Sequence, residues 1–294
     1  MCILPLTLKP KFMRTSTFFK SIALIATFSL ISCSEETTTT ADTSGLTSDD
    51  VSVNAKMDAV SGDVTLIAEN QLDEQNTGKN HISILPACAT VTTVVSGNTW
   101  TSTVDFGTTG CQFTNGHGAI LRGQIIVSGS TDFSQSPYVW NYSFNNFYYD
   151  NILVEGTKTL SRTIQSTTAQ TTPHPVVVVD LDLHLTFPNG NEYDRTGTRT
   201  WELIAGYDTP LVFADNVYLA TGTWTTVGEG TSNVSTVTTP LRFEISCQYR
   251  LVAGEIRVAR NGHTADVNYG TGACDNNATI SIDGGTPYAF TFGN

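Results

Sequence analysis

Four cysteines, two of which end similar segments, are the first candidates for chemistry. The segments "VDFGTTGC" (residues 104–111) and "VNYGTGAC" (residues 267–274) each end in a cysteine, and each has another cysteine upstream. Such a repeat could form an active site, a split metal site or a structural device used twice. The cysteines do not form the Cys-x-x-Cys pairs that are typical of zinc sites. Asp105 of the first segment corresponds to Asn268 of the second, which argues against a shared catalytic role.

We predict that these cysteines form two disulfides. Their number is even, and the chain begins with an export signal, so it is expected in a compartment where disulfides persist. Three pairings are possible, and we favour Cys88–Cys111 and Cys247–Cys274 because each pair closes one local hairpin unit. In the chain-entropy model, a loop of this size stabilises the fold by about 3 kcal/mol.

A second candidate is the strand-like run "VVVVDLDLHLTF" at residues 176–187. It places Asp180, Asp182 and His184 on one strand face and leucines on the other. Two carboxylates and an imidazole could hold a divalent cation. The same alternation is what a sheet with one solvated face requires, and we favour that interpretation. The sequence also lacks the zinc-protease, nucleophile-elbow and phosphate-loop motifs, so we predict no catalytic residue, no metal site and no cofactor.

An aromatic run, "YVWNYSFNNFYYD" at residues 138–150, is the most unusual stretch in composition. Trp140, Tyr142 and Phe144 share one strand face. Flat rings interleaved with asparagines are typical of sugar-binding surfaces, where rings stack on the sugar. Core packing is the alternative and the one we favour. Exposed rings at Trp140 and Tyr142 would support sugar binding, and buried rings would exclude it.

The N-terminal residues 1–33 are expected to be a lipoprotein signal peptide. Four basic residues precede an apolar stretch, "SIALIATFSLIS", which is too short for a membrane-spanning helix. The stretch ends at Cys33, and "LISC" resembles a bacterial lipobox, in which the cysteine is lipidated and becomes the new N-terminus. An ordinary secretory signal with an incidental cysteine is the alternative. Residues 34–47 are polar and acidic and are expected to form a flexible tether.

Residues 48–80 are predicted to form a helix and a linker. The apolar residues Val53, Met57, Val60, Val64 and Ile67 recur at spacings of three and four, which places them on one helical face. The residue at position 48 is a serine, a good N-cap, and two aspartates follow it in the first turn. This stripe is expected to pack on the sheet that follows.

Residues 81–294 are predicted to form an all-β domain. Threonine, valine, isoleucine and aromatic residues dominate, with turn signals about every ten positions. Three runs share the pattern Gly-Thr-x-Thr, beginning at Gly156, Gly197 and Gly222, as expected for a meander of similar strands. The fold class is therefore mainly β: an antiparallel meander or β-sandwich-like sheet with one N-terminal helix and two disulfide-stapled hairpins.

The charge of the chain excludes some partners. It has 15 basic and 27 acidic residues, and four of the basic residues but no acidic one lie before Cys33. The part after the signal peptide therefore carries 11 minus 27, or −16. Such an acidic chain argues against nucleic acid and against anionic lipid as partners. We expect the N-terminal lipid to hold the protein to a membrane.

The sequence resembles a family of uncharacterised lipoproteins from Bacteroidetes, especially flavobacteria. The matching segments cover most of the chain after the signal and include "LISC", "CATVT", "TVDFGTTGC", "RGQIIV", "VEGTKT", "TFPNGNEYDRTGTRTWE", "TTPL", "ISCQYRLVAGEI" and "VNYGTGACDNNATISIDG". The resemblance implies a lipidated Cys33 and structural roles for Cys88, Cys111, Cys247 and Cys274. It implies no activity, ligand or catalytic residue.

These observations predict a lipid-anchored lipoprotein of the outer membrane. Glu35 and Glu36 resemble an acidic surface-export signal, which favours the cell surface. We expect a non-enzymatic binding or structural role, with an outer-membrane protein or a glycan as partner. Two alternatives remain: a glycan-binding accessory lipoprotein in polysaccharide capture, and a hydrolase whose site has no recognisable motif.

Overall fold

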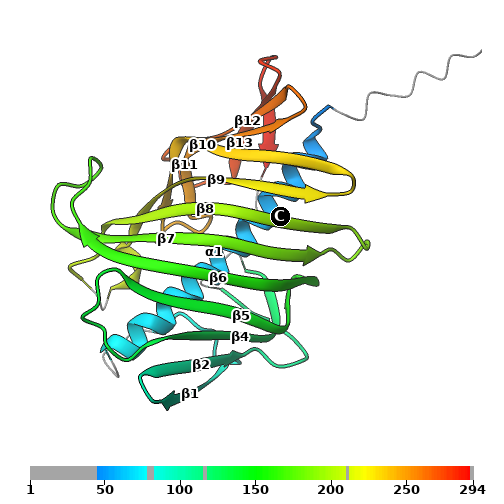
Figure 1. The fold of residues 1–294 in the computed structure, drawn as a ribbon. Helices are drawn as coiled ribbons and strands as arrows, with labels where there is room; N and C mark the ends of the chain where they lie inside the picture. The colour runs from blue at the N-terminus through cyan, green and yellow to red at the C-terminus, as the bar shows by residue number, and fades with distance from the viewer. Residues whose placement is uncertain (1–44, 78–82, 115–117, 210–211, 292–294) are drawn as a thin grey trace, which may run out of the picture. The chain divides into compact units, whose positions relative to one another are not determined.

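One long helix and an extended sheet make up the part of the chain that the structure describes (Figure 1). A computed structural model gives residues 45–77, 83–114, 118–209 and 212–291. The helix is α1 (Ser48–Thr77), and a short 3-10 helix, η2, covers Phe213–Asp215. The strands are β1 (Thr90–Ser96), β2 (Thr99–Asp105), β3 (Cys111–Gln112), β4 (Ile120–Ser130), β5 (Tyr138–Tyr149), β6 (Ile152–Gln165), β7 (His174–Thr186), β8 (Glu192–Ala205), β9 (Val217–Gly228), β10 (Thr231–Glu244), β11 (Leu251–Arg260), β12 (His263–Thr271), β13 (Asn277–Ile282) and β14 (Tyr288–Thr291).

The strands form one continuous antiparallel meander. Each strand pairs with the next along the chain, except that β2 pairs with β4 and the two-residue β3 pairs with β4 at the side of this path. The prediction of a mainly β meander with one helix and two disulfides is confirmed. Among the described residues, neither α1 nor η2 contains the long apolar stretch that a membrane-spanning helix needs.

The start of α1 differs by one residue from the prediction. Thr47, not the serine that follows it, caps the helix. The Thr47 hydroxyl accepts a hydrogen bond from the Asp50 amide (3.2 Å), and the Asp50 carboxylate accepts one from the Thr47 amide (2.9 Å). This reciprocal capping box requires an acceptor side chain three residues after the cap. Asp50 lies three residues after position 47 and supplies this acceptor. The residue three positions after the serine is Val51, whose side chain cannot accept a hydrogen bond.

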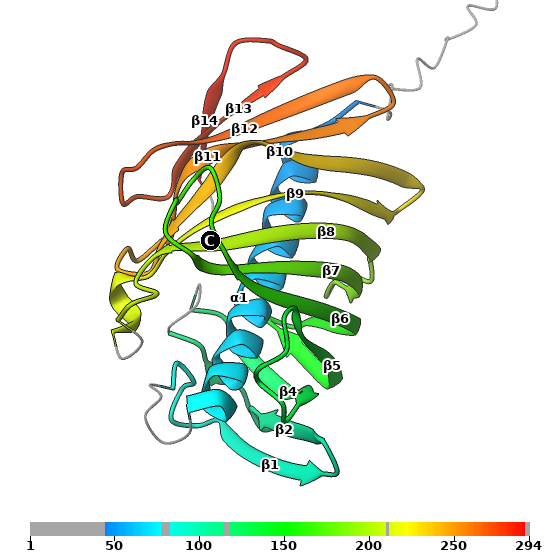
Figure 2. The same ribbon diagram turned by 60° about the vertical axis from the view of Figure 1, so that its left-hand side comes forward.

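Helix α1 crosses the strands on one face of the sheet, here called the inner face (Figure 2). Its N-terminal end reaches Arg260 of β11, and its C-terminal end reaches Thr93 of β1. A 30-residue helix is about 45 Å long, which equals the width of about nine strands at their usual spacing. The helix length therefore matches the sheet that it must cover.

The predicted apolar stripe of α1 forms the contact with the inner face. Met57, Val60, Val64 and Ile67 are fully buried in the core, and Val53 packs against them while partly buried. Burying each such side chain contributes roughly 1.5–3 kcal/mol. The stripe is the main reason that the helix lies on the sheet.

The repeated Gly-Thr-x-Thr pattern brings neighbouring strands close together. Gly156 has φ +104°, and a Cβ added there would lie 2.2 Å from the Asp182 carbonyl oxygen of β7. At Gly222 φ is +145°, and a Cβ would lie 2.3 Å from the Thr198 oxygen of β8. Only glycine tolerates both the conformation and the close approach. The pattern thus marks the places where backbones touch.

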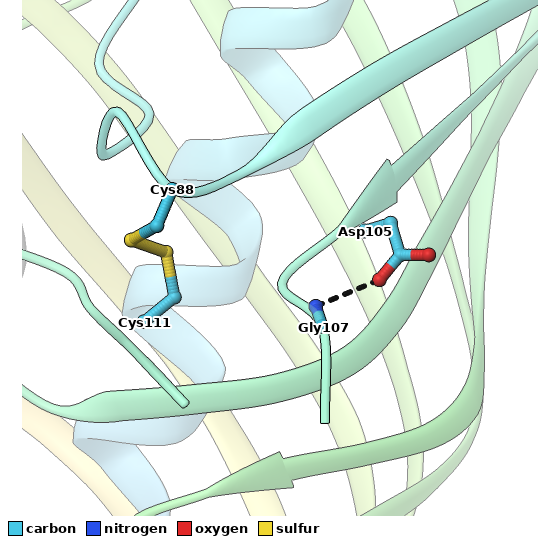
Figure 3. The surroundings of a disulfide bond; sticks show 4 residues. All are labelled: Cys88, Asp105, Gly107 and Cys111. Carbon is cyan, nitrogen blue, oxygen red and sulfur yellow. Dashed lines mark hydrogen bonds between the residues drawn. A yellow bond between two sulfur atoms is a disulfide. The ribbon is translucent and has the colours of Figure 1, made fainter. Parts of the chain in front are cut away.

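The two cysteine segments are structural, as predicted, and they use the same turn. Cys88–Cys111 and Cys247–Cys274 are disulfides with Cα–Cα distances of 5.9 and 5.5 Å. Figure 3 shows the first, beside the turn in which the Asp105 carboxylate accepts a hydrogen bond from the amide two residues on (2.7 Å).

In the second segment, the Asn268 side-chain oxygen accepts from the amide two residues on (2.8 Å). Asp and Asn serve equally well in this Asx turn, because both offer the side-chain oxygen that it needs. The Asp/Asn difference between the two segments therefore has a structural explanation.

Candidate ligand-binding site

The aromatic run of β5 belongs to the core. Trp140 and Tyr142 are 0% and 1% exposed, and Phe144 is partly buried. The Tyr142 hydroxyl lies 3.3 Å from the hydroxyl of Thr65 on α1. The hypothesis that these rings form a sugar-stacking surface is corrected, because their strand face is the one that α1 covers.

The Asp180–Asp182–His184 row lies on the outer face of β7. Both aspartates are exposed, and the His184 ring nitrogen Nδ1 lies 2.8 Å from the carboxylate of Asp194 on β8. Thr198 donates a hydrogen bond to Asp180 (3.2 Å). These are cross-strand pairs on a solvated face. Across the described residues, no group of three His, Cys, Asp or Glu side chains could hold a metal ion.

Cys33 and the two glutamates of the predicted export signal lie outside the described residues. The lipid anchor therefore remains a prediction.

A row of ion pairs joins α1 to the inner face of the sheet. Each pair takes an aspartate from the helix and an arginine from a strand. The pairs are Asp50 with Arg260, Asp58 with both Arg195 and Arg199, and Asp73 with Arg162. The strand partners follow the order β11, β8, β6 as the helix advances. These pairs therefore set which helix residue lies over which strand.

The densest part of this row surrounds Asp58. The guanidinium groups of Arg195 and Arg199 both bond to its carboxylate, and their side chains are 0% and 4% exposed. Both stack over the ring of Trp224, at 5.0 and 3.8 Å from its centroid. Lys158 is also buried, and its ammonium donates to the Ser61 hydroxyl (2.7 Å) and carbonyl (3.1 Å).

The cations of this cluster are incompletely compensated. Burial, followed by repulsion from Arg199 and Arg195, holds the pKa of Lys158 well below its usual value, although Asp58 acts in the opposite direction. Burial also lowers the pKa of Arg195 to about 10, against the attraction of Asp58. Low dielectric surroundings penalise charge that lacks a partner. One carboxylate serves two guanidinium groups here.

A cavity of about 400 Å³ opens beside this cluster, between α1 and the sheet. The helix contributes small residues, including Ala55, Ala59 and Gly62, and these leave space. Aromatic and aliphatic side chains form most of the remaining wall, among them Phe187, Trp201, Phe243, Leu251, Ile256 and Phe290. This size and lining are typical of pockets that bind small molecules, roughly 300–1,000 Å³.

Four charged residues also line this cavity. Arg199 reaches its wall from the buried cluster, together with Asp58, while Lys56 and Asp150 are exposed. Asp150 is already engaged, because its carboxylate accepts a hydrogen bond from the Ile120 amide (2.7 Å). Arg199 is thus the buried cation at an otherwise mostly apolar site.

A second cavity, of about 700 Å³, lies along the C-terminal half of α1. Trp201 borders both cavities. Glu69, Asp73 and Arg162 line the second one, among apolar residues such as Leu66. Burial, and after it the nearby charge of Asp73, raise the pKa of Glu69 to about 8, against the opposing effect of Arg162. Glu69 therefore titrates near neutral pH.

Sequence reasoning missed the buried cluster, although a signal was present. In the Gly-Thr-x-Thr repeats, the third position is Lys158, Arg199 or Trp224. All three side chains are buried on the inner face, two residues from a glycine where strands touch. A lysine and an arginine at equivalent positions of β-strands that are otherwise rich in threonine indicated a polar interior.

Comparison with known proteins adds no family. No protein-family model matches the chain, and no curated protein or solved structure is similar to it. The resemblance to flavobacterial lipoproteins therefore stays a prediction, and the function must be inferred from the site.

Proposed function

We propose that this protein is a lipid-anchored, non-enzymatic binding lipoprotein of the outer membrane, and that it holds its ligand in the 400 Å³ cavity beside α1. The cavity carries this proposal: its wall is aromatic and aliphatic, and a buried arginine lies at one side. Apolar cavities with a few polar groups are the usual form of a small-molecule site. Two disulfides support export.

The ion pairs of α1 support binding in a preformed site. Asp58 and its arginines hold the helix in place over the strands, so the cavity wall does not depend on a ligand for its shape. A preorganised wall reduces the entropy lost when a ligand binds.

Two experiments test this proposal. For the anchor, cells are fed an alkyne fatty acid, and we expect the protein to be labelled and the Cys33→Ser variant to lose the label. Equal labelling of both would refute the anchor. For binding, protein from native membranes is extracted with organic solvent and analysed by mass spectrometry. We expect a small molecule in the wild type that is lost when Ala59→Phe fills the cavity. The same extract from both proteins would contradict a ligand there.

A hydrolase is the second candidate, favoured by the 700 Å³ cavity. Glu69 and Asp73 both line it. Glu69 with a raised pKa fits a general acid, and Asp73, bonded to Arg162 at 2.9 Å, is a second carboxylate in the same cavity. A panel of chromogenic glycosides tests this role. Hydrolysis lost in Glu69→Gln but kept in Glu192→Gln would support it, and no hydrolysis by the wild type would refute it.

A further inference from the structure

We propose that the 400 Å³ cavity binds a long-chain fatty acid, whose carboxylate meets Arg199 while its alkyl chain lies along the aromatic wall. This inference rests on the proposed binding function and names the class of its ligand.

The buried charge favours an anion. Asp58 is bonded to both Arg195 and Arg199, so this group of three carries two positive charges and one negative charge. An uncompensated charge inside a protein is strongly unfavourable. One further negative charge would neutralise the group, and a singly charged carboxylate supplies that amount.

Arg199 has a donor that no described residue uses, although this atom does not itself border the open space of the cavity. Its Nε atom is buried and has no hydrogen-bond partner in the described part of the chain. Arg199 also lines the cavity, whereas Arg195, whose Nε is equally unpartnered, does not. Guanidinium groups recognise carboxylates with two adjacent donors. The head group is therefore expected at Arg199.

The rest of the wall fits an alkyl chain. Trp201, Phe243, Leu251 and Ile256 present carbon surface, and Ala55 on the helix leaves room opposite them. Each buried methylene group adds to the binding, so a chain of many carbons gains far more than a short acid. Lys56 and Asp150, exposed at the cavity wall, have opposite charges and do not favour a second anionic group.

Photolabelling tests the proposal with the full-length protein in phosphatidylcholine nanodiscs. The probe is a palmitate analogue with a diazirine in mid-chain, and the matched probe is the corresponding alcohol. We expect the acid to label cavity residues such as Phe243 and Leu251, with at least about tenfold higher apparent affinity than the alcohol, since a hydrogen bond to a charged group contributes about 1.5–3 kcal/mol.

Two variants locate the head group. Arg199→Gln is expected to lower the affinity for the acid by about tenfold and to leave the alcohol unchanged. Arg195→Gln removes the other partner of Asp58, and with it the surplus positive charge, but it keeps the guanidinium at the cavity wall, so it should lower the affinity for the acid less than Arg199→Gln does. Thermal unfolding of both variants establishes that each is folded under the labelling conditions.

Three outcomes would overturn the proposal: equal labelling by acid and alcohol, equal loss in the two arginine variants, or label outside the cavity. A cavity that takes up the alcohol as well as the acid would leave the broader binding function intact. Equal lipid labelling of the wild type and Cys33→Ser, together with acid-selective labelling of the cavity, would refute the anchor and support the fatty-acid site.

Discussion

At the scale of single residues, buried charges define the inner face of this protein. Arg195, Arg199 and Lys158 lie under α1, where hydrophobic side chains could be buried at a lower cost in free energy. Replacing a buried ion pair by apolar residues is often neutral or stabilising, whereas removing one partner is costly. The cluster therefore positions α1 on the sheet more than it stabilises the fold. It aligns α1 with β8 and places a cation at the cavity wall.

The Asp58→Asn variant tests this view. It leaves two guanidinium groups without their carboxylate, and we expect the free energy of unfolding to fall by about 3–5 kcal/mol. Asp73→Asn is the matched control, because Asp73 and Arg162 are 44% and 21% exposed and such pairs contribute about 1 kcal/mol or less. Urea unfolding of both variants measures the difference. Similar losses would show that burial does not distinguish the two pairs.

The Glu69→Gln variant should be more stable than the wild type, but only above acidic pH. Burial raises the pKa of Glu69 to about 8 in the folded protein, above the usual value of about 4.3 for an unfolded chain. As pH rises between these values, the unfolded chain releases its proton first, so the wild type loses stability. Glutamine resembles the protonated form and avoids this loss.

We expect a gain on the order of 1 kcal/mol or more at pH 9 and almost none at pH 4. Thermal unfolding across this pH range measures it. The exposed Glu192→Gln variant is the control and should follow the wild type. A gain that is independent of pH would mean that Glu69 is not held in its protonated form.

At the scale of elements, the spacing of apolar residues predicted the helix and the face that it buries. The apolar stripe around Met57 is covered by the sheet, as the period of three and four residues required. The cap moved to Thr47 because a reciprocal carboxylate lies three residues later. The charged cluster depends on contacts between residues 137 and 141 positions apart, Asp58 with Arg195 and with Arg199. No local pattern in the sequence specifies such pairs.

The difference between local patterns and contacts of distant residues also explains the aromatic run of β5. Alternation predicted that Trp140 and Tyr142 share a face, and they do. Whether that face is exposed to water or covered by α1 depends on how the other elements pack. The alternation of residues along a strand does not predict this packing.

Replacing glycine by alanine should have opposite effects on stability in the strands and in α1. Gly222→Ala places a methyl group 2.3 Å from the Thr198 oxygen at φ +145°, and we expect a loss of about 2 kcal/mol or more. Gly62 lies in α1, and a Cβ there meets nothing within 4 Å, so Gly62→Ala should gain about 0.5–1 kcal/mol. Denaturant unfolding measures both. A stable Gly222→Ala protein would contradict the close approach of β8 and β9.

At the scale of the described fold, the two disulfides lie toward opposite ends of the strand order. Cys88 precedes β1 and joins β3, whereas Cys247 and Cys274 flank β11 and β12. The central strands β6 to β9 are held instead by α1 and by their neighbours on both sides. An open sheet is weakest at its ends, where strands have fewer neighbours.

Each bridge should therefore protect its own end of the sheet. Replacing Cys247 and Cys274 by serine opens a loop with a sequence separation of 27 residues, and we expect a loss of about 3–4 kcal/mol. Hydrogen exchange should then quicken in β11–β14 and stay slow in β6–β9, because the helix still covers the centre. The matched Cys88→Ser, Cys111→Ser protein should instead lose protection in β1–β3. Uniform loss across all strands in either protein would mean that the sheet opens as one unit, with its stability shared from edge to edge.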